Sequence, residues 1–389
     1  MIENPNFSDF FKEFRQKSPI FSDYINLTSE LTLDELVDRE EQISKIWTEL
    51  VYTLEHNLSA KTFFLFGPPG TGKTETIKYI LKKTIQWAKL PHAPKIAHFY
   101  NNCAIYNTPY SIMRELCRSL KIPIPQRGFS TEEAYTRFLE KLPSLQLNYL
   151  IIIFDEIDLL YSNKKAGNDL LYKISRSITS ESNPLRILFF GITNNLLLVN
   201  ALDSRVKSSL YPIIEILFPP YSAIELQKIL YHRAKRALKP EILQYGAVEF
   251  IAAHFAQTGG DARQAITVLR LCGEMAEKSL QLNIQEAQAR LAIKKYMELQ
   301  NHEIIQSLDP CRKKILEAIQ NLQSKKIPPL TGDLYNEYQR LCLQSNYPLV
   351  GPRQFSNHLK HLEKLNLVNI EPVHRGIRGN SRKITSYFP

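Results

Sequence analysis

The most specific pattern in this sequence of 389 residues is the stretch Gly67-Pro68-Pro69-Gly70-Thr71-Gly72-Lys73-Thr74. It fits the phosphate-binding loop pattern G-x-x-x-x-G-K-[ST] at every position. An apolar, β-prone run, Phe63–Phe66, precedes it, and a helix-like segment follows. Glycines permit positive φ angles, so successive N–H groups can point at phosphate oxygens, and the helix N-terminus adds a favourable partial charge. We predict that residues 67–72 cradle the phosphates of ATP or ADP, that Lys73 reaches the β- and γ-phosphates, and that the Thr74 hydroxyl ligates Mg²⁺.

Two carboxylates, Asp155 and Glu156, directly follow the continuous apolar run Leu150–Phe154. Such a run is typical of a strand buried on both faces of a parallel sheet, and ligands bind at the carboxyl ends of such strands. We expect Asp155 to coordinate Mg²⁺ through water and Glu156 to activate the attacking water. The alternative is an acidic strand-to-turn pair without a ligand. Asp158 is interpreted as a helix cap or a surface charge.

Three further polar residues are candidates for the same site, each with a plainer alternative. Asn194 follows the apolar strand Ile187–Ile192 and would hold the lytic water or contact the γ-phosphate, unless it only forms a turn. Arg205 is either an arginine finger that reaches a neighbouring subunit's nucleotide or an exposed cation. Arg263 follows Asp261, a predicted helix N-cap, and either closes over the γ-phosphate or is an ordinary first-turn arginine.

Composition and charge limit the class of protein. Hydrophobic residues make up 44% of the chain, which favours two or three packed domains over disorder. The five cysteines form no C-x-x-C pair and are read as buried thiols of a reducing compartment. The sequence has no apolar run of membrane-spanning length, and its N-terminus lacks the pattern of a signal peptide. We therefore expect a cytoplasmic protein without a membrane partner. Residues 301–389 carry thirteen Lys or Arg and seven Asp or Glu, a net +6, which predicts a polyanion partner; a solvated basic surface is the alternative.

The pattern of apolar residues divides the chain into three parts. Strands alternate with helices up to the two prolines of Phe218–Tyr221, which predicts an α/β core over residues 1–218 with a parallel sheet. Residues 219–300 are predicted to be an all-helical lid, because they carry helix-forming residues and almost no strand signal. Three helical segments and two short strands over residues 301–389 predict a winged helix-turn-helix domain.

The winged-helix region offers two groups of polar side chains to a duplex. The third helix presents Arg353, Ser356, Asn357 and Lys360, and the Gly- and Arg-rich tip of the hairpin presents Arg375, Arg378 and Arg382. A helix can read base edges in the major groove, while an arginine on a wing can enter a narrow minor groove. We therefore expect these residues to bind double-stranded DNA. A winged helix that serves only protein contacts is the alternative.

Taken in order, these elements resemble the AAA+ replication initiators of the origin-recognition and Cdc-six family, in their compact archaeal form. The resemblance covers almost the whole chain. The matching segments are Gly67–Thr74 for Walker A, Asp155–Asp158 for Walker B, Gly191–Asn194 for sensor 1, Asp203–Ser209 for the arginine-finger segment and Gly260–Arg263 for sensor 2. Asn195 stands where the family often has Asp, and Ser204 where proline is common.

The same resemblance implies further site residues. Asp38-Arg39-Glu40 matches the segment that lies against the adenine, and Phe218–Tyr221 looks like the core-to-lid junction. It thereby implies nucleotide contacts for Val37, Arg39 and Tyr221. An insertion near residues 105–142 resembles the initiator-specific helical motif, which in this family contacts DNA beside the winged helix. The implied contact residues are Gln126, Arg127 and Gly128.

The function that this resemblance implies is an ATP-regulated initiator of DNA replication. It would be a slow Mg²⁺-dependent ATPase that acts as a molecular switch, binds origin double-stranded DNA beside a paralogous initiator subunit, helps recruit the replicative MCM-type helicase and associates with the nucleoid. Two other classes compete with it. One is an AAA+ winged-helix ATPase of transcription or mobile elements, against which the insertion argues. The other is a remodelling chaperone whose winged helix grips protein.

Overall fold

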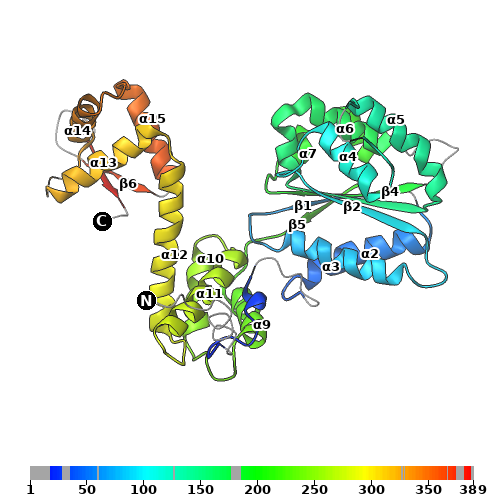
Figure 1. Ribbon diagram of the computed structural model, residues 1–389, viewed down its shortest axis with the longest axis horizontal. Coiled ribbons are helices and arrows are strands. Elements are labelled where there is room, and N and C mark those ends of the chain that lie inside the picture. The colour runs from blue at the N-terminus through cyan, green and yellow to red at the C-terminus, as the bar shows by residue number, and fades with distance from the viewer. Residues whose placement is uncertain are drawn as a thin grey trace, which may run out of the picture. The chain divides into compact units, whose positions relative to one another are not determined.

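The computed structural model describes residues 18–28, 36–58, 61–125, 128–176, 185–325, 327, 329–365, 367–373 and 381–386. The chain forms two compact units, Met1–Ala292 and Ile293–Pro389. The first unit contains a parallel sheet and the helices around it, and the second contains helices and a β-hairpin (Figure 1). We describe each unit by itself.

The first unit is built on a five-stranded sheet with the order β2-β3-β4-β1-β5, in which every neighbouring pair is parallel. Four of these strands lie where apolar runs of the sequence predict them, namely Phe63–Phe66, Ile96–Tyr100, Leu150–Phe154 and Ile187–Ile192. The fifth, β5, was not among the predicted strands, because this edge strand leaves Glu215 and Leu217 exposed and has no continuous apolar run. The strands are β1 (Lys61–Phe66), β2 (Ile96–Asn102), β3 (Tyr149–Asp155), β4 (Arg186–Thr193) and β5 (Ile213–Leu217).

Alternate side chains of the central strands feed two separate cores, one on each face of the sheet. In β1, Phe64 and Phe66 pack into one core, and Phe63 and Leu65 into the other. Helices cover both faces, as Figure 1 shows. One face carries α2 (Glu40–Glu55) and α3 (Lys73–Trp87), and the other carries α4 (Pro109–Ser119), α5 (Thr131–Lys141), α6 (Lys164–Arg176), α7 (Leu198–Ala201) and α8 (Ser204–Leu210). Short 3₁₀ helices, η2 (Leu142–Leu145) and η3 (Ile157–Asn163), flank β3.

Two capped helices, α4 and α5, fill the segment for which the initiator-specific insertion is predicted. Thr108 caps α4 by accepting from the Ser111 N–H, and Ser130 caps α5 by accepting from the Glu133 N–H. The buried residues Ile112 and Phe138 anchor these helices to the core that contains Phe64. The insertion is therefore packed against the sheet over the described part of this segment.

The lid follows β5 and consists of α9 (Ala223–Ala237), α10 (Ala247–Gln257), α11 (Ala262–Lys278) and the beginning of α12 (Glu286–Ser307). The N-terminal segment that holds η1 (Tyr24–Leu27) lies on these helices, since the Ser22 N–H donates to the Ala237 carbonyl and Phe21 pairs with Leu238. Phe21 also lies directly against Gly273 of α11. The N-terminal segment is therefore packed on lid helices, and the predicted limits of core and lid stay a prediction.

The second unit has the predicted three helices and a hairpin around one apolar core. Phe355, Leu359 and Leu362 of the third helix are buried in this core, which also receives Ile384 from the hairpin. Proline begins the first and third helices, where its missing N–H costs nothing. The elements are α13 (Pro310–Ser324), α14 (Thr331–Gln344), α15 (Pro352–Lys364) and the antiparallel strands β6 (Val368–Val373) and β7 (Ser381–Ser386). The predicted fold class is thereby confirmed. Over the described residues, no helix is both long and apolar enough to cross a membrane.

The buried strand β3 allows a test of the sheet core. Ile152 is fully buried between Phe99 of β2 and Phe189 of β4. Ile152→Ala removes packed methyl groups and leaves a cavity, so we expect it to lower the free energy of unfolding by about 3 kcal/mol. Ile105→Ala is the matched control, because Ile105 is 70% exposed. Urea titrations followed by circular dichroism measure both. Equal destabilisation by the two variants would contradict this description of the core.

Candidate functional site

A cavity of about 350 Å³ opens at the carboxyl ends of β1, β3 and β4, beneath the lid helices α9 and α11. Its size is in the range of small-molecule sites. Most of the residues predicted for nucleotide binding line it. They are Val37, Pro69, Gly70, Thr71, Gly72, Lys73, Thr74, Asp155, Glu156, Asn194, Tyr221 and Arg263. The structure thus brings together side chains from the core, the linker and the lid.

The phosphate-binding loop connects β1 to α3, and the lid packs directly on it. Gly70 and Gly72 have φ angles of 72° and 88°, which favour glycine. A Cβ on Gly70 would lie 1.8 Å from Oδ1 of Asp261, and one on Gly72 would lie 2.6 Å from the Tyr221 hydroxyl oxygen. In addition, the Ala262 N–H donates to the Gly70 carbonyl at 3.2 Å. Glycine is therefore required both for the backbone conformation and for the approach of the lid.

Lys73 is a buried cation whose ammonium group has three acceptors. Its Nζ donates to the carbonyls of Gly67 and Pro68, each at 2.7 Å, and to Oδ1 of Asn194 at 2.9 Å. Burial, and secondarily the nearby Arg263 cation, lower the pKa of Lys73 to about 8. Lys73 and Asn194, which are both predicted to contact phosphate, are thus already hydrogen-bonded to each other.

Thr74 and Asp155, the predicted Mg²⁺ residues, are hydrogen-bonded to each other. Oδ2 of Asp155 accepts from the Thr74 hydroxyl at 2.8 Å and from the Tyr100 hydroxyl at 2.7 Å. Burial and the adjacent carboxylate raise the pKa of Tyr100, which stays a donor. Among the described residues, no three His, Cys, Asp or Glu side chains cluster as a metal site on their own. A hydroxyl and a carboxylate beside a phosphate-binding loop are nevertheless the protein ligands that Mg²⁺ takes in nucleotide sites, so these residues fit the ion.

Hydrogen bonds connect the residues at the end of β4 with those that follow β3. Glu156 lines the cavity with a φ of 53°, a left-handed conformation that is strained for a non-glycine residue and typical of functional sites. Asp158, which the sequence led us to interpret as a cap or surface charge, instead accepts from the Thr193 hydroxyl at 2.8 Å. Thr193 in turn accepts from the Asn195 N–H at 2.9 Å, so Asn194 lies in a turn fixed from both sides.

The two candidate arginines occupy different surroundings. Arg263 lies in the first turn of α11 and lines the cavity; its side chain is 59% exposed and its backbone N–H donates to Asp261. Arg205 lies outside the cavity on α8, 65% exposed and paired with Asp203 at 3.2 Å. An exposed arginine agrees with either of the alternatives stated for Arg205, and its role stays a prediction.

Sequence reasoning missed several residues of the cavity wall. Helix α9 contributes Ile229, His232 and Arg233, whose spacing of three and four residues puts them on one helix face. Arg233 is buried and donates to the Asn26 carbonyl at 3.2 Å. That helical spacing was the available signal. The other unpredicted residues of the wall are Leu36, Glu75, Lys78, Tyr100, Asn102, Ile192, Thr193, Ala262 and Ile266.

Three predicted nucleotide residues do not line this cavity. Gly67 and Pro68 offer their carbonyls to Lys73. Arg39, which the family resemblance placed against the adenine, is buried behind the loop and donates from Nε to the Thr71 carbonyl at 2.9 Å. Val37 and Tyr221, implied by the same resemblance, do line the cavity.

The predicted DNA residues of the third winged-helix helix share one face of α15. Arg353, Asn357 and Lys360 are exposed on α15, with Ser356 partly buried beside them, opposite the buried residues of the same helix. Arg382 is exposed on β7. In the first unit, Gly128 is exposed, with open space around its Cα. The other predicted residues lie outside the described residues: Gln126, Arg127, Arg375 and Arg378.

Comparison with known proteins places the same elements in the same order. Three family models match: an AAA domain over residues 56–198, a Cdc6 AAA+ ATPase-type lid domain over 227–294 and a CDC6 C-terminal winged helix domain over 303–387. The ORC1-type DNA replication protein of Thermococcus kodakarensis is 32% identical over 98% of this chain and 92% of that protein. ORC1-type DNA replication protein 1 of Methanosarcina acetivorans is 31% identical over 100% of this chain and 93% of its own length.

A solved structure agrees with these relatives over nearly the whole chain. The Aeropyrum pernix ORC1 protein in complex with DNA superimposes with a TM-score of 0.75 at 30% identity, covering 95% of this chain and 94% of that one. The likeness therefore extends through the core, the lid and the winged helix.

The lowered pKa of Lys73 makes ligand binding depend on pH. Bound phosphate favours the ammonium form, so above pH 8 binding must take up a proton that the free protein has lost. We expect ADP affinity to fall as pH rises through 8, approaching about tenfold per pH unit at higher pH. Calorimetry from pH 7 to 9.5 in buffers of different ionisation enthalpy measures both the affinity and the proton uptake.

The control for this experiment is Lys73→Arg, whose guanidinium stays charged over the whole range. Whatever affinity that variant retains should not change with pH. A flat affinity profile for the unaltered protein would show that the protonation of Lys73 does not limit binding.

Proposed function

Since the chain belongs to the family of ORC1-type DNA replication proteins, we propose that it is an ATP-regulated replication initiator, which binds origin double-stranded DNA and helps recruit the replicative helicase. The observation that carries the ATP-regulated part is the shared wall of the cavity. The phosphate-binding loop comes from the core, while Ala262 and Arg263 come from the lid. A ligand bound there contacts both parts, so its phosphates can bias how the lid is held.

The chemistry of the cavity supports slow ATP hydrolysis with Mg²⁺ as cofactor. Thr74 and the carboxylate of Asp155 would hold Mg²⁺, and the bound ion would neutralise part of the phosphate charge. Lys73 would transfer its hydrogen bonds from loop carbonyls to phosphate oxygens. Glu156 would accept the proton of the attacking water, and Asn194 would orient that water or contact the γ-phosphate.

The switch would be completed by residues outside the core. Arg263 reaches the cavity from α11 and would distinguish ATP from ADP through the γ-phosphate. Arg205 points from an exposed site and would serve the nucleotide of a neighbouring initiator subunit. A difference in coupling of about 1–3 kcal/mol between the ATP and ADP states would suffice for regulation, so rapid turnover is not required.

The basic face of α15 supports DNA as the ligand of the second unit. Arg353, Asn357 and Lys360 supply two cations and one amide on an exposed helix face, and Arg382 adds a cation on the hairpin. The Aeropyrum pernix relative is a DNA complex, and we extend that ligand to this chain. Together with residues 126–128 of the insertion, this face would hold origin DNA. A paralogous initiator subunit and an MCM-type helicase would be the protein partners, in nucleoid-associated cytoplasm.

Glu156→Gln tests the assigned water activation. We expect the variant to bind ATP with the affinity of the parent and to release phosphate at least about a hundredfold more slowly, because an amide cannot take the proton of water. Glu55→Gln is the control, since Glu55 is exposed at the end of α2, away from the cavity. Phosphate release and ATP calorimetry are the measurements. Hydrolysis by Glu156→Gln at the parental rate would remove Glu156 from the mechanism.

The DNA assignment is tested on the DNA that flanks the gene of this protein. We expect a footprint there in the presence of Mg-ATP that changes with Mg-ADP. Arg353→Ala and Lys360→Ala should each weaken binding and lower the slope of log affinity against log salt by about 0.9 for each DNA phosphate that the variant no longer binds. Lys89→Ala, at an exposed site after α3, is the control. Salt-independent binding, or variants that equal the control, would favour a protein-binding role for the winged helix.

A further inference from the structure

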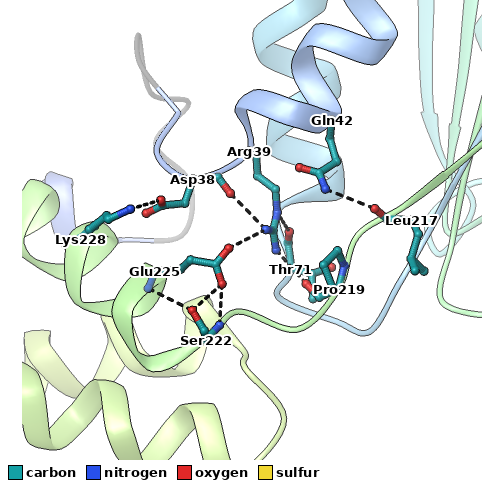
Figure 2. Close-up of polar contacts among 9 residues, drawn as sticks. All are labelled: Asp38, Arg39, Gln42, Thr71, Leu217, Pro219, Ser222, Glu225 and Lys228. Carbon is teal, nitrogen blue, oxygen red and sulfur yellow. Dashed lines mark hydrogen bonds and ion pairs between the residues drawn. The ribbon is translucent and has the colours of Figure 1, made fainter.

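Arg39 is a buried residue at the centre of a polar cluster that joins four segments of the first unit (Figure 2). Besides its bond to the Thr71 carbonyl, its guanidinium donates to the carbonyl of Pro219 at 2.9 Å and to that of Asp38 at 3.1 Å. Glu225 of α9 lies 3.6 Å away as the carboxylate partner. One side chain thus contacts the phosphate-binding loop, the core–lid linker, the N-terminal segment and the first lid helix.

The aromatic rings of the linker enclose the same guanidinium. The Cζ atom of Arg39 lies 3.6 Å from the centroid of the Tyr221 ring and 5.8 Å from that of Phe218. A planar guanidinium can stack flat on a ring while its five N–H donors point outward in its own plane, whereas an ammonium group has no flat face and only three donors. The cluster is therefore built for arginine.

The contacts around Arg39 extend the cluster into the start of α9. Glu225 accepts from the Ser222 N–H and the Ser222 hydroxyl, each at 2.7 Å, and so caps α9 while it also faces Arg39. Lys228, one turn further along α9, pairs with the Asp38 carboxylate at 2.6 Å. Figure 2 shows these contacts between the start of α9 and the segment that holds Asp38 and Arg39.

The position of Arg39 outside the cavity argues against a direct contact between this side chain and the base of a nucleotide. Its side chain is 2% exposed and does not line the cavity. Tyr221, on which it stacks, does line the cavity and approaches Gly72 of the loop. Burial lowers the pKa of Arg39, while the neighbouring Tyr221 and Glu225 oppose that effect. The energetic cost of burying this cation is offset only while loop, linker and lid helix stay together.

We propose that Arg39 is a positioning residue that fastens the phosphate-binding loop to the core–lid linker and to α9, so that lid orientation and phosphate binding are coupled through it. This inference rests on the proposed nucleotide-regulated function and deepens it. It replaces the expectation that Arg39 recognises adenine. A positioning role predicts that loss of Arg39 weakens the binding of nucleotides irrespective of their base.

The first test measures the affinity of the full chain for Mg-ADP and Mg-GDP by calorimetry. Arg39→Lys should lower the affinity for each nucleotide about tenfold and leave the ratio of the two affinities unchanged. A loss confined to ADP, so that the ratio collapses, would overturn the proposal in favour of base recognition. Affinities equal to those of the parent would overturn it as well. Failure of the parent to bind either nucleotide would instead contradict the proposed function.

Arg290→Lys is a matched control. Arg290 also stacks on a ring, with Cζ 4.1 Å from the Phe250 centroid, and also pairs with a carboxylate, that of Glu286. It lies in α12 and does not line the cavity. This variant should bind both nucleotides as the parent does.

A second test uses the unaltered protein and so does not depend on a variant that folds. Hydrogen exchange should show that Mg-ADP slows exchange in residues 67–74 and, at the same time, in residues 221–226 of the linker and α9. In Arg39→Lys the first region should still respond while the second does not, a split that a general loss of stability would not produce. Protection of the loop without any effect on residues 221–226 in the unaltered protein would overturn the proposal.

Discussion

The parallel pairing of β1, β3 and β4 is the constraint on which the rest of the cavity depends. Because all three strands end at one edge of the sheet, the loop after β1, the carboxylates after β3 and the amide after β4 meet there. Thr74 can then bond to Asp155, Lys73 to Asn194, and Thr193 to Asp158. These pairs join residues that are 35 to 121 positions apart in the chain. Reversing any of these strands would separate them.

A second feature of the site is that carbonyl groups of the phosphate-binding loop are hydrogen-bonded to donors of the protein. The carbonyls of Gly67 and Pro68 accept from Lys73, that of Gly70 from the lid, and that of Thr71 from Arg39. These four oxygens, which would repel a phosphate, are thus each bonded to a donor of the protein. Two buried cations lie on opposite sides of the loop, Lys73 at the cavity and Arg39 behind it. The loop owes its shape to both, although only one of them belongs to the sequence motif.

Sequence alone predicted the α/β class, four of the five strands, the helical lid, the winged helix and the phosphate-binding loop, because each of these is encoded locally by periodicity or by a motif. It missed β5, whose edge position exposes alternate residues, and the bond between Asp158 and Thr193, which only tertiary contact creates. It also missed His232 and Arg233, because their helical spacing indicates a shared face of α9 but not that this face lines a cavity. The roles of the site residues and the domain limits stay predictions, and four predicted DNA residues lie beyond the described part.

The three acceptors that Lys73 holds have a consequence for which anions can enter. Arrival of a ligand is an exchange reaction, in which phosphate oxygens must displace two carbonyls and an amide from an ammonium group that is already satisfied. A single phosphate or sulfate ion makes fewer contacts with the loop than a polyphosphate, so it offsets the loss of these three hydrogen bonds less fully. A polyphosphate brings further contacts along the loop and Thr74 at the same time. We therefore expect this exchange to favour polyphosphates over small anions.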